Sequence, residues 1–305
     1  ESMQMNERDS WAKHICSQAI ECSIPQVELW APSKRISNRI SARSEMQYMS
    51  AYAAIYGGQS RYVNRYSEEN KTETTNDDTV EVIPLKSNEC LDNEALIIVQ
   101  EAHLVSRSLR TSHIRFGSGR LLEDISCFLH SECKIVFIGD PYSLTYGKSE
   151  DSALHQPLLS DLFRVDPMCY RSSIPKVYSD SRSRLSIELA TSIETDTFNY
   201  LKYNFDGDSL VECNKDDVAK DLYEWFKMPL EYPPLNAILC YKNEECYSIN
   251  KWIRAKCLHN QEILNSGDLL LVNNDVHVVD QDGLQTAQRL SKGMYLRVEE
   301  TGETK

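Results

Sequence analysis

The sequence predicts an α/β protein built around a parallel β-sheet. Three short apolar runs have the length and the β-branched content of buried parallel strands, and each ends in polar or turn residues. Strand, polar tip, helix and strand succeed one another in the order typical of α/β folds. Ligands of open α/β sheets bind at the carboxyl ends of the strands, so chemistry is expected at these three tips. The predicted strands are Val27–Ala31, Ala95–Val99 and Lys134–Ile138, and we expect all three to be central strands of one sheet.

Composition restricts the class of protein. A chain of 305 residues can form two domains, and 41% hydrophobic with 26% charged residues is ordinary for a soluble globular protein. No apolar run approaches the roughly 18 residues of a membrane helix, and no signal peptide opens the chain, so we expect a cytoplasmic protein that does not enter a membrane. The 10 cysteines include no CxxC pair, which disfavours zinc and disulfides.

The net charge of −13 is unfavourable for binding nucleic acid, because affinity for phosphates comes from Lys and Arg. A local basic surface remains compatible with that total. One short stretch holds Lys34, Arg35, Arg39 and Arg43. Such a run is either a solvated helix face or a contact for a negatively charged partner, and composition does not choose between them.

Two domains are expected, residues 1–228 and residues 229–305, with a polar insertion near residues 67–78. After about residue 155 the pattern changes to helical spacing, and prolines then break the chain near residues 228–235. The chain beyond these prolines has the pattern of the beginning of a second α/β domain. The elements predicted after residue 155 are helices at Ser183–Ile193, Asp216–Phe226 and Glu244–Cys257, and strands at Ala237–Tyr241 and Asp268–Val272.

The strand ending in Gln100-Glu101-Ala102-His103 resembles the Walker B box of helicases, an apolar strand followed by Asp-Glu-Ala-His. In that box one carboxylate holds Mg²⁺ and the next orients the attacking water. The resemblance implies that Glu101 is catalytic and that Gln100 stands at the metal and nucleotide position. Gln100 is neutral, and a poorer ligand for a hard cation than aspartate. The alternative interpretation is a buried strand followed by a capped helix.

The tip of the strand at Lys134–Ile138 resembles helicase motif III, in which a strand ends in Gly-Asp. The resemblance implies that Gly139 lies at the nucleotide and that Asp140 senses the γ-phosphate. Ser143 stands where the family has Gln, so the motif is incomplete. After this motif the family supplies a catalytic arginine, for which Arg182 is the first candidate and Arg184 the next. Both also suit a solvated helix start.

Trp30-Ala31-Pro32-Ser33-Lys34-Arg35 resembles helicase motif Ia, a strand tip that contacts single-stranded DNA. Together the matches run in the family's order over roughly residues 27 to 275, and on that order the chain resembles RecD-like superfamily 1 DNA helicases. The resemblance implies a RecA-like P-loop NTPase domain followed by part of a second, with ATP and Mg²⁺ as cofactors and single-stranded DNA as partner. The implied DNA contacts are Pro32, Ser33, Lys34, Arg35 and His103.

The family's phosphate-binding loop, GxxxxGK[ST], is missing from its expected place before a helix at Trp11–Cys22. The first glycine is Gly57, so the loop is missing from the stretch near Arg8-Asp9. Either the loop has been lost in evolution, or the sequence omits it. Two main hypotheses result: an ATP-driven DNA helicase or translocase, or a degenerate helicase-like module that binds single-stranded DNA without hydrolysing ATP. An unrelated α/β protein with chance matches is the third.

Overall fold

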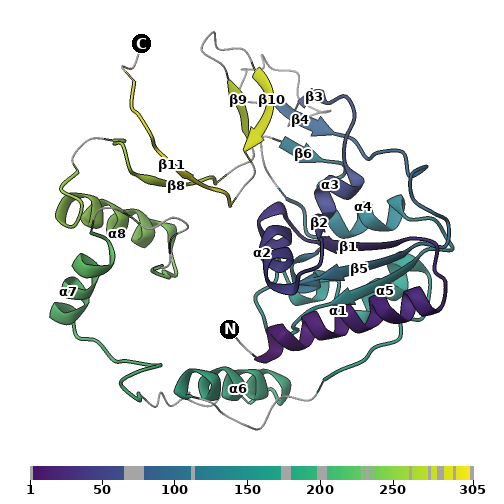
Figure 1. Ribbon diagram of the computed structural model, residues 1–305, viewed down its shortest axis with the longest axis horizontal. Helices are drawn as coiled ribbons and strands as arrows, with labels where there is room; N and C mark the ends of the chain where they lie inside the picture. Colours follow the sequence, from purple (N-terminus) through teal and green to yellow (C-terminus); the bar gives the residue numbers. More distant parts are fainter. Residues whose placement is uncertain are drawn as a thin grey trace. The chain divides into compact units, whose positions relative to one another are not determined.

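The computed structural model describes residues 3–64, 79–110, 114–172, 180–197, 205–227, 230, 234, 236–260, 263–273, 276–279, 285–290 and 293–302. The predicted insertion at residues 67–78 and most of the predicted boundary near residues 228–235 lie outside these ranges. The chain forms two compact units (Figure 1). Unit 1 is Glu1–Pro175 with Ala190–Phe198, and unit 2 is Lys176–Leu189 with Asn199–Lys305.

Unit 1 contains a four-stranded, all-parallel sheet of order β2-β1-β5-β7. Its strands are β2 (Met49–Ser50), β1 (Val27–Ala31), β5 (Leu96–Gln100) and β7 (Lys134–Ile138). The three predicted strands are therefore confirmed, with β5 beginning and ending one residue later than expected. That shift draws Gln100 into the ladder opposite Ile138. β7 is an outermost strand of the sheet, although we expected it to be a central one.

Helices cover both faces of this sheet. α1 (Met3–Glu21) packs Ala12 and Ala19 against Leu96 and Ile98 of β5, and α2 (Lys34–Ser44) lies on β1. The opposite face meets α3 (Ala51–Ile55), α4 (Leu121–Phe128) and α5 (Gln156–Phe163). Side chains alternate between the two faces along β5. Leu96, Ile98 and Gln100 therefore point toward α1, and Ile97 and Val99 point toward α3, α4 and α5.

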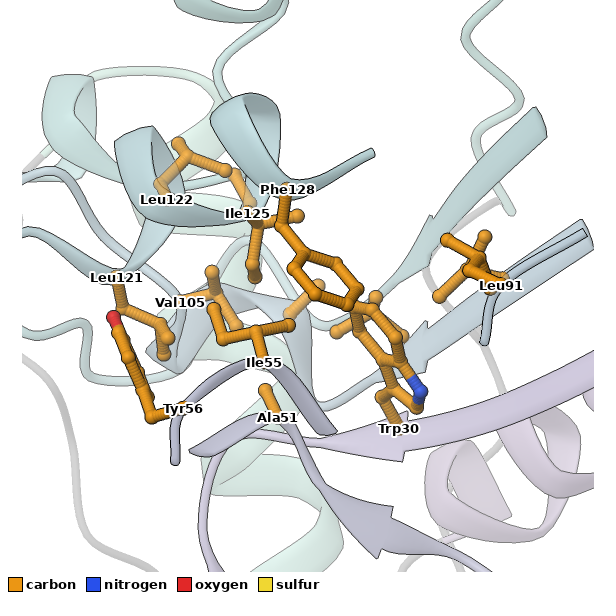
Figure 2. Packing of buried hydrophobic residues seen from close by; sticks show 14 of the residues in the cluster. Trp30, Ala51, Ile55, Tyr56, Leu91, Val105, Leu121, Leu122, Ile125 and Phe128 are labelled. Carbon is orange, nitrogen blue, oxygen red and sulfur yellow. The ribbon is translucent and has the colours of Figure 1, made fainter. Parts of the chain in front are cut away.

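The larger core gathers around Trp30, which is completely buried. Figure 2 shows Ile125 and Phe128 of α4 pointing from the helix toward Trp30 and Ile55. The rings of Trp30 and Phe128 are tilted, with centroids 6.3 Å apart. Removing an aromatic side chain of this kind typically lowers the free energy of unfolding by about 3–5 kcal/mol. This core fixes β1 and β5, whose ends carry the candidate site.

A second, smaller sheet in unit 1 has the order β3-β4-β6, with strands at Arg61–Asn64, Thr79–Ile83 and Ile114–Phe116. The turn after β6 wraps around a carboxylate of the protein itself. Ser118 N–H donates to both oxygens of Asp124, and a Cβ on Gly117 would lie 2.4 Å from Asp124 Oδ2. Tyr56 O–H donates to the same oxygen at 2.6 Å. Gly117-Ser118-Gly119 therefore forms a turn before α4.

Unit 2 matches the sequence expectation in its helices more than in its strands. α7 (Lys215–Trp225) and α8 (Asn243–Lys256) lie where they were predicted, and α6 (Ser181–Glu194) contributes to both units. β8 (Leu269–Leu271) confirms the strand expected there, but it pairs antiparallel with β11 (Tyr295–Arg297). β9 (Val276–Val279) and β10 (Gln285–Leu290) form another antiparallel pair.

The strand predicted at Ala237–Tyr241 is wrong. Those residues form no strand, and the side chains of Leu239 and Tyr241 are each 95% exposed. An apolar run becomes a strand only when it finds a pairing partner and a face to bury. Within the described residues this run has neither. None of the described helices is long and apolar enough to cross a membrane.

Candidate functional site

The strand tips meet at one edge of the parallel sheet. Trp30 pairs with Val99 and Gln100 with Ile138, so the residues that come after β1, β5 and β7 leave the sheet side by side. Those residues are Pro32-Ser33, Glu101 and Gly139-Asp140. The expected convergence at this edge is therefore observed. The early part of α1 arrives at the same place and contributes Arg8 and Asp9.

Arg8 lies between the two carboxylates that come after β5 and β7. Its Nη2 is 3.4 Å from Glu101 Oε1, and its Nη1 is 3.9 Å from Asp140 Oδ2. The side chains of Arg8 and Glu101 are only 12% and 6% exposed. A guanidinium placed between a buried and a partly buried carboxylate offsets much of the cost of removing those charges from water. The structure thus supplies a cation from its own chain where two negative groups converge.

His103 joins the same group of charges. Its Nδ1 accepts a hydrogen bond from the backbone N–H of Asp140 at 3.3 Å, and its Nε2 lies 3.6 Å from Glu101 Oε2. Burial lowers the pKa of His103 below its usual value, and the positive charge of Arg8 lowers it further. The negative charges of Glu101 and Asp140 oppose that shift without reversing it. His103 is therefore buried, bound to the Asp140 backbone and close to the Glu101 carboxylate, rather than presented on the surface for a DNA contact.

Glu101 itself adopts a backbone conformation that is unusual for its residue type. It has φ 57° and ψ 38°, the left-handed region, directly before the short 3₁₀ helix η2 (Ala102–Leu104). Among the described residues no donor hydrogen-bonds to Glu101 Oε1, although that oxygen is buried. Left-handed backbone and unsatisfied polar atoms concentrate at functional sites. These two features make Glu101 the strongest functional candidate at this edge.

Gln100 and Asp9 form a second, adjacent network. The Gln100 side-chain amide donates to Asp9 Oδ1, and its carbonyl oxygen accepts from Tyr48 O–H at 2.5 Å. Arg43 donates to both oxygens of Asp9, from Nε at 2.6 Å and from Nη2 at 2.7 Å. Burial alone would raise the pKa of Asp9, but the hydrogen bonds from Arg43 and Gln100 outweigh it and hold that pKa below its usual value. Burial also raises the pKa of Tyr48, so its hydroxyl stays a donor.

The side-chain oxygen atoms of Asp9 and Gln100 are not arranged to bind a Mg²⁺ ion. Mg²⁺ needs oxygen ligands in near-octahedral arrangement, usually including a carboxylate free to bind it. The carbonyl oxygen of Gln100 is taken by Tyr48, and both oxygens of Asp9 are taken by Arg43. No group of three or more His, Cys, Asp or Glu side chains in the described part of the chain is placed to hold a metal ion.

Asp140 and Gly139 have evident structural roles. Asp140 accepts from the backbone N–H of Tyr142 at 2.9 Å and from the hydroxyl of Ser143 at 3.0 Å, so it organises its own loop. A Cβ on Gly139 would lie 3.0 Å from the backbone nitrogen of His103 and 2.9 Å from a methyl group of Leu154. Gly139 is therefore required for close packing of the β7 tip against the turn after β5.

The positively charged side chains that follow β1 lie on α2. Pro32 is buried, and Ser33 caps the helix by accepting from the backbone N–H of Ile36 at 3.4 Å. The next two side chains, Lys34 and Arg35, are exposed. Ser33 thus has a capping role that explains its presence without a ligand.

Arg182 and Arg184 lie on the part of α6 that belongs to unit 2. The side chain of Arg182 is 69% exposed, and its guanidinium is 3.7 Å from Asp180 Oδ2. Asp180 also accepts from the backbone N–H of Ser183 at 2.6 Å, as an N-cap residue does. The surroundings of Arg182 are those of a solvated helix start, which was the alternative interpretation.

Sequence reasoning missed the residues that complete the site. Arg43 appeared only as part of a basic run, Arg8 and Asp9 only as the place where a phosphate loop was expected, and Tyr48 not at all. Asp9 and Arg43 are separated by 34 positions, so no local pattern indicates their pairing. No protein-family model matches this chain, and no curated protein does either. The fold and the site define an α/β protein whose sheet edge holds an internally paired cluster of charges.

Proposed function

We propose that this chain is a single-stranded DNA-binding module on a degenerate, RecA-like helicase frame, and that it does not hydrolyse ATP. The observation that carries the proposal is the basic face of α2. This helix has four basic and no acidic residues among its 11, although the whole chain has a net charge of −13. Lys34, Arg35 and Arg39 are exposed, and only Arg43 is turned inward to Asp9.

The position of this face supports a backbone contact. α2 begins directly after β1, at the carboxyl edge where open α/β sheets bind their ligands. The positive end of the helix dipole lies there as well and favours phosphate groups. Contacts of this kind position a strand without reading its bases. We therefore expect binding that depends strongly on salt and weakly on sequence.

The test is a titration of a labelled oligo-dT with wild type and a Lys34→Ala/Arg35→Ala variant across salt concentrations. The slope of log K against log salt should fall in magnitude by roughly 1–2 units, since each phosphate contact contributes about 0.7 for a single strand. A Lys13→Ala/Lys134→Ala variant removes the same charge from exposed positions on α1 and at the start of β7, and should leave the slope unchanged. Equal slopes in all three proteins would refute the proposal.

An ATP-driven helicase or translocase is the second candidate, favoured by the convergence of Glu101 and Asp140 and by the unsatisfied Oε1 of Glu101. Against it stand the internally paired Asp9 and Gln100 and the poor fit to Mg²⁺. DNA-stimulated phosphate release distinguishes the two. We expect none from wild type. Turnover that Glu101→Gln abolishes would establish the enzyme instead, because that carboxylate would then orient the attacking water.

A further inference from the structure

We infer that Arg43 is a built-in cation that stands in place of a divalent metal at the tip of β5. It would join α1, α2 and β5 in one arrangement that needs neither metal nor nucleotide. The inference goes beyond the proposed function, because its tests measure thermal stability and the response to Mg²⁺ and involve no DNA.

Asp9, Arg43, Gln100 and Tyr48 form a cluster whose charges balance without any bound ion. Asp9 contributes one negative charge, and Arg43 neutralises it through a two-point contact of 2.6 and 2.7 Å. Gln100 is neutral and uses both ends of its amide, donating to Asp9 and accepting from Tyr48. Because Asp9 can only accept and the Tyr48 hydroxyl donates, the orientation of the amide is determined by its neighbours. A carboxylate at position 100 would place a second negative group beside Asp9, the carboxylate that the Arg43 guanidinium contacts.

The cluster links three elements that are remote in sequence. Asp9 comes from α1, Arg43 from the last turn of α2 and Gln100 from the final position of β5. Gln100 is completely buried and Asp9 is 7% exposed, so water contributes little and the ion pair is weakly screened. Removing one member would leave a buried partner unsatisfied, which is the costly case for such pairs. The arrangement therefore holds α2 in place from its carboxyl-terminal end.

The first experiment is the substitution Gln100→Glu, which changes the charge while nearly keeping the size. We expect the Tm of the full chain to fall by roughly 5–10 °C, because two buried carboxylates then share one guanidinium. Mg²⁺ at about ten times its Kd should raise the Tm of this variant by about 4 °C. It should leave the wild type unchanged, because Arg43 already neutralises Asp9.

The second experiment transposes the charge. Asp9→Asn combined with Gln100→Glu restores one carboxylate, one amide and one guanidinium. This double variant should recover at least half of the lost Tm and lose the response to Mg²⁺. If Gln100→Glu alone does not fold, the double variant still tests the inference. In that case the double variant should fold, whereas Asp9→Asn alone should be destabilised.

Three results would overturn the inference. In the first, Mg²⁺ stabilises the wild type as much as Gln100→Glu, which would mean that the cluster accepts a metal. In the second, Gln100→Glu keeps the Tm of the wild type, so the charge at position 100 is unconstrained. In the third, the double variant is no more stable than Gln100→Glu, which would mean that Arg43 does not serve the pair as its cation.

Discussion

Glu101, directly after β5, and Asp140, the second residue after the neighbouring strand β7, share one guanidinium. Arg8 Nη2 is 3.4 Å from Glu101, and Arg8 Nη1 is 3.9 Å from Asp140. Replacing Arg8 by methionine keeps most of its apolar length but leaves two carboxylates, one of them buried, without this counter-ion. We expect the free energy of unfolding to fall by about 3 kcal/mol, measured by urea denaturation. Arg8→Lys retains the charge and should lose less than half as much.

An unchanged free energy of unfolding in Arg8→Met would show that both carboxylates are well solvated, contrary to the 6% exposure of the Glu101 side chain. The comparison with Arg8→Lys also separates charge from shape. A point charge satisfies the electrostatic requirement, whereas only the planar guanidinium reaches both carboxylates at once.

The second prediction concerns the close packing of Gly139. A Cβ there would lie 2.9 Å from Leu154 Cδ1 and 3.0 Å from the backbone nitrogen of His103, and the backbone cannot move aside cheaply. Gly139→Ala should therefore lower the free energy of unfolding by about 1–3 kcal/mol. Gly302→Ala is the control, because a Cβ at that position meets nothing within 4 Å. Equal stability of the two variants would show that the β7 tip has more space than its contacts indicate.

The third prediction concerns pH. Burial and Arg8 lower the pKa of His103 in the folded state, so the unfolded chain binds a proton more readily. Stability contributed by neutral His103 is present above about pH 6.5 and is lost as the pH falls below that unfolded value, by at most about 1.4 kcal/mol per pH unit for one proton. His103→Gln should remove this part of the pH dependence. Urea denaturation of both proteins between pH 5 and 7.5 measures it, and parallel curves would contradict the prediction.

The parallel sheet was predictable because its strands carry their own signal. Ala95–Val99 is a continuous apolar run, as expected of a strand buried on both faces, and Val27–Ala31 and Lys134–Ile138 are apolar apart from Glu28 and Lys134. Their polar tips then predicted the edge where Glu101 and Asp140 meet. Ala237–Tyr241 carries the same signal and forms no strand, because pairing depends on a partner elsewhere in the chain.

The partners within the site were not predictable for a related reason. Gln100 looked like a weakened metal ligand, and its amide instead bridges Asp9 and Tyr48, which lie 91 and 52 positions away. The choice between a metal site and an ion pair depends on Arg43 turning inward while the other basic residues of α2 face outward. That choice is a property of the tertiary fold, because helix periodicity alone places Arg43 on the same face as Arg39, four positions earlier.

The last prediction uses the backbone of Glu101 to ask why a glutamate occupies this position. Its φ of 57° lies in the left-handed region, which costs a residue with a Cβ roughly 1–2 kcal/mol and costs glycine almost nothing. Glu101→Ala and Glu101→Gly both remove the carboxylate from Arg8 and His103, so the difference between them isolates the backbone. Glu101→Gly should be the more stable by about 1 kcal/mol in urea denaturation. At Glu123 in the first turn of α4, where the backbone is helical, alanine should instead be the more stable by roughly 0.5–1 kcal/mol. The same order at both positions would mean that Glu101 bears no strain. The opposite order would mean that the fold retains a glutamate where glycine would be easier, as expected if the carboxylate at the tip of β5 is kept for its charge.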